Sequence, residues 1–136
     1  MIGKTTSQIE SKAMHNILKI LLVFSFLGLC TQVHAQQTSQ YDSKMLRLAE
    51  ILGSLHYLQN LCSTPTSQWR DRMNELIDAE NPNATRRARL YAAFNDAYRA
   101  FSTNYHTCTK AAVELNQQYI KEGSVLSNEL LNHFGN

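Results

Sequence analysis

The sequence predicts an all-α fold, a four-helix up-down-up-down bundle that is tied by one disulfide. Three observations lead to this prediction. They are an aromatic stripe at helical spacing, three further amphipathic segments, and two cysteines placed where two predicted helices end. The breaks between the segments are short, and short connections make consecutive helices antiparallel neighbours.

The aromatic stripe lies in the segment from Leu90 to Cys108, and we expect the rest of the bundle to be organised around it. Its members recur at intervals of 3, 4, 3, 4 and 3, which places them on one helix face. They are Tyr91, Phe94, Tyr98, Phe101, Tyr105 and Cys108. Each ring can bury about 150–250 Å², so other helices must cover this face. The predicted helix covers residues 84–106, with Asn83 as its N-cap.

The first predicted helix covers residues 40–61 and has an apolar stripe with spacings of 3 and 4. The stripe consists of Leu48, Ile51, Leu52, Leu55, Leu58 and Cys62. Gly53 interrupts this helix at a cost of about 1 kcal/mol relative to Ala, which indicates close packing of a neighbouring helix. A second helix over residues 67–80 follows a break at residues 63–66, with Thr64 or Thr66 as its cap.

The fourth predicted helix covers residues 110–134, and Thr109 is its expected N-cap. Its apolar stripe is predicted to contain Val113, Ile120, Leu126 or Ser127, Leu130, Leu131 and Phe134. Gly123 and Ser124 lie in the middle of this helix. We expect the helix to bend or to pack closely at these small residues.

Residues 1–35 have the pattern of a secretory signal peptide. Lysines precede or border an apolar run at residues 17–29, and Val33-His34-Ala35 supplies small residues for cleavage after Ala35. The run is shorter than the roughly 20 apolar residues of a membrane-spanning helix. Met14 as the true start and a retained N-terminal anchor are alternatives. A lipoprotein attached through Cys30 is disfavoured, because Leu29 stands where lipoprotein processing requires a small residue. Residues 36–40 are then a loose N-terminal segment, and residues 41–135 form the helical bundle domain.

Charge excludes two classes of partner. Cleavage removes three lysines and one glutamate, so the remaining 101 residues carry ten basic and ten acidic side chains. A neutral exported domain gives no electrostatic basis for binding nucleic acid or an anionic membrane surface. We therefore expect no nucleic-acid partner, and no stable membrane span after signal cleavage.

The cysteines predict one disulfide. Cys30 leaves with the signal peptide, so Cys62 and Cys108 remain as an even pair in an oxidising compartment. In an up-down-up-down bundle the first and third helices end on the same side, which brings both cysteines together. Two free buried thiols are the alternative.

Several segments resemble one family of proteins. They are LAEILGSLHYLQNLC at residues 48–62, WRDRMNELIDAE at residues 69–80, RRARLYAAFNDAYRAF at residues 86–101, and residues 105–109. Together they resemble a family of small exported alphaproteobacterial proteins that carries only a conserved-hypothetical label. The resemblance implies a secreted, helical, cysteine-paired domain. It implies no activity and supplies no catalytic residues.

Two sets of residues contain possible metal ligands, but each has a simpler interpretation. His56, Cys62, His106 and Cys108 could ligate zinc, but a Cys-x-x-Cys clip is lacking and a disulfide would consume both thiols. Met45 and His133 could ligate haem, yet no Cys-x-x-Cys-His attachment is present and Met45 is more simply a core residue. We expect no metal site and no cofactor.

The sequence offers few groups for catalysis. It lacks a Gly-x-Ser-x-Gly elbow, a P-loop and a dinucleotide fingerprint, and no nucleophile lies beside His56. We therefore expect a non-enzymatic protein, located in the bacterial periplasm or secreted, that contacts another envelope protein. The alternative is a periplasmic carrier that binds a small apolar ligand in the bundle core, where the aromatic stripe meets Gly53 and Gly123.

Overall fold

The computed structural model describes residues 32–135 of the chain. The chain divides into two compact units, residues 1–38 and residues 39–136. Of the first unit only residues 32–38 are described, and they belong to a helix. The signal peptide predicted for residues 1–35 lies almost entirely outside the described residues and stays a prediction. The arrangement described below is that of the second unit.

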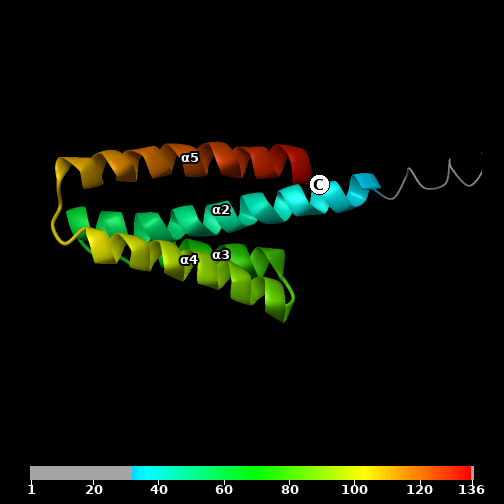
Figure 1. Cartoon of the computed structure of the whole chain (residues 1–136), viewed down its shortest axis with the longest axis horizontal. Coiled ribbons are helices and arrows are strands. Elements are labelled where there is room, and N and C mark those ends of the chain that lie inside the picture. The colour runs from blue at the N-terminus through cyan, green and yellow to red at the C-terminus, as the bar shows by residue number, and fades with distance from the viewer. Residues whose placement is uncertain (1–31, 136) are drawn as a thin grey trace, which may run out of the picture. The chain divides into compact units, whose positions relative to one another are not determined.

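Four helices and no strand make up the described residues. They are α2 (Gln32–Cys62), α3 (Gln68–Glu80), α4 (Ala84–Asn104) and α5 (Lys110–Phe134). The chain reverses direction at each of the three connections, so neighbouring helices run antiparallel (Figure 1). The predicted all-α, up-down-up-down bundle is confirmed. No helix in residues 32–135 has the combination of length and apolar character that crossing a membrane requires.

The first helix starts earlier than predicted. It begins at Gln32, so the stretch at residues 36–40 is helical, and its prediction as a loose segment is wrong. The side chains of residues 38–40 are exposed, so packing does not explain the extension. Adding a residue to an existing helix forms one hydrogen bond for each residue fixed, whereas a new nucleus is costly. A polar stretch can therefore continue a helix that starts the packed domain.

The helix at the centre of the core is α2, not the aromatic helix α4. Fourteen hydrophobic residues are buried within residues 32–135, and half of them lie on α2: Met45, Leu48, Ala49, Ile51, Leu52, Leu55 and Leu58. By contrast, only Leu90 and Phe94 are buried on α4. The reason is geometric, because α2 contacts α3, α4 and α5 on different sides and α4 keeps one side toward solvent. The α2 stripe was predicted correctly, but its central role was not.

Gly53 lies at a close approach of α2 and α4. A Cβ atom built on Gly53 would lie 2.1 Å from the carbonyl oxygen of Phe94, which is backbone and cannot move independently. Gly123 on α5 is less tightly confined, since its Cβ would lie 3.1 Å from the Cγ2 atom of Ile51 on α2. Both glycines therefore permit close helix packing, as predicted for Gly53.

The buried face of α5 agrees with the predicted one at Leu126 and Leu130 and differs elsewhere. Ala112, Leu126 and Leu130 are its buried residues, and this face rests on α2. Ion pairs fix the same orientation: Lys44 on α2 pairs with Glu129 at 2.5 Å. Val113, Ile120 and Leu131, which were predicted to belong to the core stripe, are exposed. The prediction failed for these three residues because α5 carries apolar residues on two faces, and spacing alone does not decide which face is covered.

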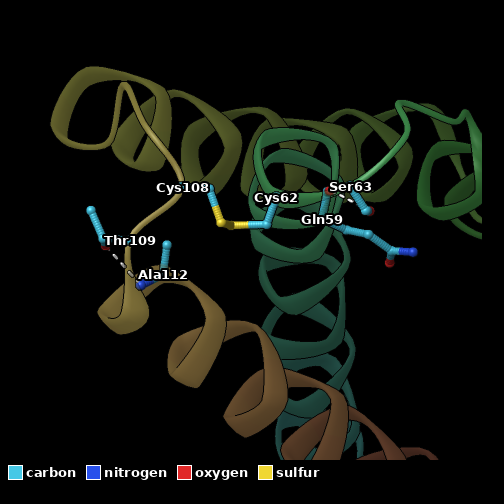
Figure 2. The surroundings of a disulfide bond; sticks show 6 residues. All are labelled: Gln59, Cys62, Ser63, Cys108, Thr109 and Ala112. Atoms are coloured by element: carbon cyan, nitrogen blue, oxygen red, sulfur yellow. Dashed lines mark hydrogen bonds between the residues drawn. A yellow bond between two sulfur atoms is a disulfide. The ribbon is translucent and has the colours of Figure 1, made fainter.

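The disulfide joins the end of α2 to the connection between α4 and α5 (Figure 2). The Cα atoms of Cys62 and Cys108 are 4.9 Å apart, and the bond spans 46 residues of sequence. The predicted pairing at one end of the bundle is confirmed. Cys108 lies four residues beyond the end of α4, and the predicted helix over residues 84–106 also ended before it.

Caps define the remaining helix boundaries. The Asn83 side chain accepts a hydrogen bond from the backbone N–H of Arg86 at 2.9 Å, and Thr109 accepts one from Ala112 at 3.2 Å, as Figure 2 shows for Thr109. Both caps were predicted. The cap of α3 was not, because Ser67 occupies that position and Thr66 instead donates its backbone N–H to Asn60.

A half-buried charge cluster holds α2, α3 and α4 together at the end of the bundle opposite the disulfide. The guanidinium of Arg86 pairs with Asp42 at 2.8 Å and with Glu80 at 3.0 Å. It also lies over the ring of Tyr41, 5.3 Å from its centroid. The Tyr41 hydroxyl donates to Glu80, and burial together with this hydrogen bond raises the pKa of Tyr41 to about 12.

Candidate functional site

A surface groove between α4 and α5 is the candidate functional site. Its volume is about 370 Å³, and α2 forms its floor. The lining residues are Arg47, Glu50 and Ser54 of α2, Ala93, Asp96, Ala97, Ala100 and Phe101 of α4, and Tyr119 of α5. We call this feature the α4–α5 groove. Its lining side chains come from three rigid helices.

The floor of the groove is charged but internally paired. Arg47 donates from Nε to Glu122 of α5 at 2.7 Å and from Nη1 to Glu50 at 3.0 Å. The hydrogen bond to Glu122 and the charges of both carboxylates raise the pKa of Arg47, so this side chain stays cationic at any physiological pH. Because one cation serves two carboxylates, this group carries a net charge of −1.

The α4 wall is smooth because its side chains are small. Ala93, Ala97 and Ala100 recur at intervals of 4 and 3, so they lie on one side of α4. Asp96 stands among them and pairs with Arg99 on the outer side of the helix. The small side chains leave the space that a methyl or an aromatic ring of a partner would fill.

An aromatic pair closes the groove on the side of the disulfide. The rings of Phe101 and Tyr119 meet edge to face, with centroids 5.7 Å apart. The guanidinium of Arg47 lies 5.7 Å from the centroid of the Tyr119 ring. Edge-to-face pairs add about 0.5–1.5 kcal/mol beyond the burial of their area. This pair therefore links α4 to the first half of α5.

The groove contains few groups that could react. The hydroxyl of Ser54 is already used, since it donates to the main-chain oxygen of Glu50 at 2.8 Å. His56 is buried elsewhere, with its ring 5.9 Å from that of Phe94 and 5.6 Å from that of Tyr98. Burial, and then the charge of Arg70, lower the pKa of His56, so its neutral form is favoured. His56 is not among the residues that line the groove.

The structure separates the residues that had been considered as metal ligands. Cys62 and Cys108 are joined to each other, so neither offers a thiolate, and His106 is exposed beside them. Met45 is a buried core residue, whereas His133 is exposed. Across residues 32–135 no three side chains of His, Cys, Asp or Glu are grouped to hold a metal ion.

Sequence reasoning did not find the α4–α5 groove. The available signal was the row of alanines at positions 93, 97 and 100, beside the aromatic stripe. Small residues at helical spacing are compatible with close packing or with open space. Their neighbour must be known before one interpretation can be chosen.

The fold and the groove define a small all-α protein, a disulfide-tied helical bundle with an open groove on its surface. Within this class the chain belongs to a family described as protein of unknown function (DUF2385), whose model matches residues 40–134. The matched range agrees with the resemblance to an uncharacterised family. Neither the curated proteins nor the solved structures contain a match to the chain.

Proposed function

We propose that this protein is a non-enzymatic helical interaction protein that binds a segment of another bacterial envelope protein in the α4–α5 groove. The groove is the observation that carries the proposal. It is open to solvent, it is lined by small apolar side chains at Ala93, Ala97 and Ala100, and its charges are paired within the protein. Such a surface favours packing of a preformed segment over chemistry.

The proposal places the mature chain in the periplasm or outside the cell, after cleavage behind Ala35. The leader sequence supports export, and so does the disulfide, because structural disulfides persist in oxidising compartments. The alphaproteobacterial origin belongs to the same proposal and rests on the sequence resemblance.

Site-specific photo-cross-linking in intact cells tests the proposal. A benzophenone side chain is placed at Ala100 in the groove, and the same side chain at Ala88, an exposed alanine of α4 outside the groove lining, is the matched control. We expect a discrete adduct with an envelope protein from position 100 only. Identical adducts from both positions, or none from position 100, would contradict the proposal.

A substitution that fills the groove is the second test. Ala97→Trp introduces a ring into the groove, while Ala88→Trp introduces the same ring on an exposed face. We expect the cross-link from position 100 to fall at least tenfold with Ala97→Trp and to stay within twofold with Ala88→Trp. Circular dichroism and melting of each variant show whether the fold is retained.

Carriage of a small apolar ligand is the second candidate function, and the Phe101–Tyr119 ring pair in the groove favours it. A ligand site in the bundle core would need open space beside Gly53 and Gly123. The backbone of Phe94 occupies that space at Gly53, and the side chain of Ile51 occupies it at Gly123. The groove is therefore the better location. Native mass spectrometry of protein purified from its host tests this alternative, and an unliganded mass counts against it.

A further inference from the structure

The paired charges of the α4–α5 groove leave two carboxylate oxygens without a hydrogen bond. Glu50 accepts from Arg47 through its Oε2 atom, and no donor within residues 32–135 binds its Oε1 atom. Asp96 accepts from Arg99 through its Oδ1 atom, and its Oδ2 atom likewise has no donor among the described residues. Both side chains line the groove. The groove therefore offers two negatively charged acceptors to whatever occupies it.

Acidic groups outnumber basic groups around these two acceptors. Arg47 is the only cation of the groove lining, which also contains Glu50 and Asp96. Glu122 binds Arg47 through both carboxylate oxygens, at 2.7 and 3.0 Å, and adds a third negative charge. Arg99 pairs with Asp96 from outside the lining, so three carboxylates share two guanidinium groups. The net charge of this set is −1, which favours a cation over an anion in the groove.

The rest of the lining is mostly apolar and short. Small side chains form the α4 wall, and the rings of Phe101 and Tyr119 close one end. From Ala93 to Phe101 this wall extends about 12 Å by the helical rise. That length corresponds to about two turns of a helix or about four residues of an extended chain. The groove, with a volume of about 370 Å³, therefore accepts a few side chains of one short segment.

We infer that the segment bound in the α4–α5 groove carries a basic side chain, arginine or lysine, which pairs with Glu50 and Asp96. This inference rests on the proposed function and names the chemistry of the partner in the same site. Arginine and lysine suit the groove because their aliphatic stems pack on apolar surface while their charged ends reach polar groups at its edge. The stem then lies on the alanines of α4, and the charged end meets the two free carboxylate oxygens.

The other kinds of segment fit less well. A segment with an acidic side chain would place like charges together, because the groove already has an excess of carboxylates. A wholly apolar segment would cover the free oxygens of Glu50 and Asp96 without replacing the water that they bind. Only a cation both neutralises the groove and satisfies these acceptors.

The exposure of the carboxylates indicates what the pairing contributes. The side chains of Glu50 and Asp96 are 44% and 67% exposed. Ion pairs at such positions add little affinity each, and salt weakens them. The two carboxylates therefore select the partner, whereas the alanine wall and the two rings supply the area of contact.

Small probes test whether the groove selects a cation. n-Butylguanidinium, n-butanol and pentanoate share a butyl group and carry a positive charge, no charge and a negative charge. Nitrogen-15 NMR spectra of the exported, disulfide-intact protein locate each probe by the backbone amides that shift. We expect n-butylguanidinium to shift the amides of residues 93–101 and to bind about fivefold more tightly than n-butanol. Binding of n-butanol as tight as that of n-butylguanidinium, or tighter binding of pentanoate, would overturn the inference.

Variants that neutralise charge assign this selection to the two carboxylates. Glu50→Gln combined with Asp96→Asn should weaken n-butylguanidinium binding about fivefold and change n-butanol binding less than twofold. Asp78→Asn is the matched control, because Asp78 is an exposed carboxylate of α3 outside the groove lining. It should change the binding of either probe less than twofold. Equal weakening by Asp78→Asn would overturn the inference, since general attraction to an acidic surface would then explain the binding.

The photo-cross-link from position 100 applies the same variants to the partner in intact cells. We expect the adduct to fall about fivefold when Glu50→Gln and Asp96→Asn are combined, and to stay within twofold with Asp78→Asn. Circular dichroism of each variant shows whether the fold is retained. An adduct that persists unchanged in the double variant overturns this inference alone, because the groove is then occupied without a paired cation. Absence of the adduct from the otherwise unchanged protein rejects the proposed function and this inference with it.

Discussion

Replacing Gly53 by Ala provides a direct test of the helix packing, because two physical effects predict opposite signs. Helix propensity alone predicts that Gly53→Ala stabilises α2 by about 1 kcal/mol. The structure predicts the reverse. The new methyl would lie 2.1 Å from the carbonyl oxygen of Phe94, closer than any real Cβ contact.

The steric effect should win because the obstacle is backbone. Relief requires α4 to move away from α2 by about 1 Å, which loosens the packing around Phe94 and Leu90, both almost fully buried. Overpacking of this kind costs about 1–3 kcal/mol, and the displaced core adds to that cost. After the gain in helix propensity, we expect a net destabilisation of about 1–2 kcal/mol.

Urea unfolding followed by circular dichroism at 222 nm measures this effect. For a domain of this size the expected loss corresponds to a melting temperature lower by about 5–15 °C. Gly123→Ala is the matched control, because its methyl would lie 3.1 Å from a side-chain atom, the Cγ2 of Ile51, which needs to give way by only a few tenths of an ångström. It should be neutral or stabilising. If Gly53→Ala proves as stable as the parent protein, the close approach of α2 and α4 is wrong.

The other predictions concern the disulfide, a buried histidine and the half-buried charge cluster. Cys62→Ser, or reduction of the parent protein, should remove about 4 kcal/mol of stability, since the bond closes a loop of 46 residues; equal melting temperatures with and without reductant would contradict this. Burial lowers the pKa of His56, so the unfolded chain binds the proton more readily. The free energy of unfolding should therefore fall as the pH drops below about 6.5, the pKa of an unperturbed histidine. In His56→Gln the urea concentration at the unfolding midpoint should depend less on pH between pH 8 and pH 5 than in the parent protein. Arg86→Met leaves Asp42 and Glu80 without their cation and should cost about 1–2 kcal/mol in urea unfolding. Arg72→Met, which removes an exposed ion pair with Glu75, should cost less than about 0.5 kcal/mol, and a similar loss in both variants would count against the cluster.

Local chemistry along the chain was sufficient to predict most helix boundaries. Asn83 and Thr109 each accept a hydrogen bond from a backbone N–H three residues later, and such a cap depends only on neighbouring residues. The start of α2 was missed for the opposite reason. Ser39 lies three residues before Asp42, which is a spacing typical of a helix start, but the helix continues through both residues from Gln32.

The candidate site depends on contacts that no single segment contains. Two features form the α4–α5 groove. The ion pair between Arg47 and Glu122 holds α5 against α2, and the small side chains of Ala93, Ala97 and Ala100 leave open space beside α4. Each of these residues is unremarkable in the sequence. They form a groove only together, and recognising it requires the relative positions of α2, α4 and α5.

The sequence by itself determined the helical class, the antiparallel order and the pairing of Cys62 with Cys108, because periodicity, caps and connection lengths are properties of nearby residues. The tertiary structure decided that α2 is central and that α5 buries Ala112 and Leu126 but leaves Ile120 exposed. The physical reason is that a periodic pattern shows which residues share a helix face, but it does not show which other helix packs against that face. Only the packing of all four helices selects which apolar face is removed from water.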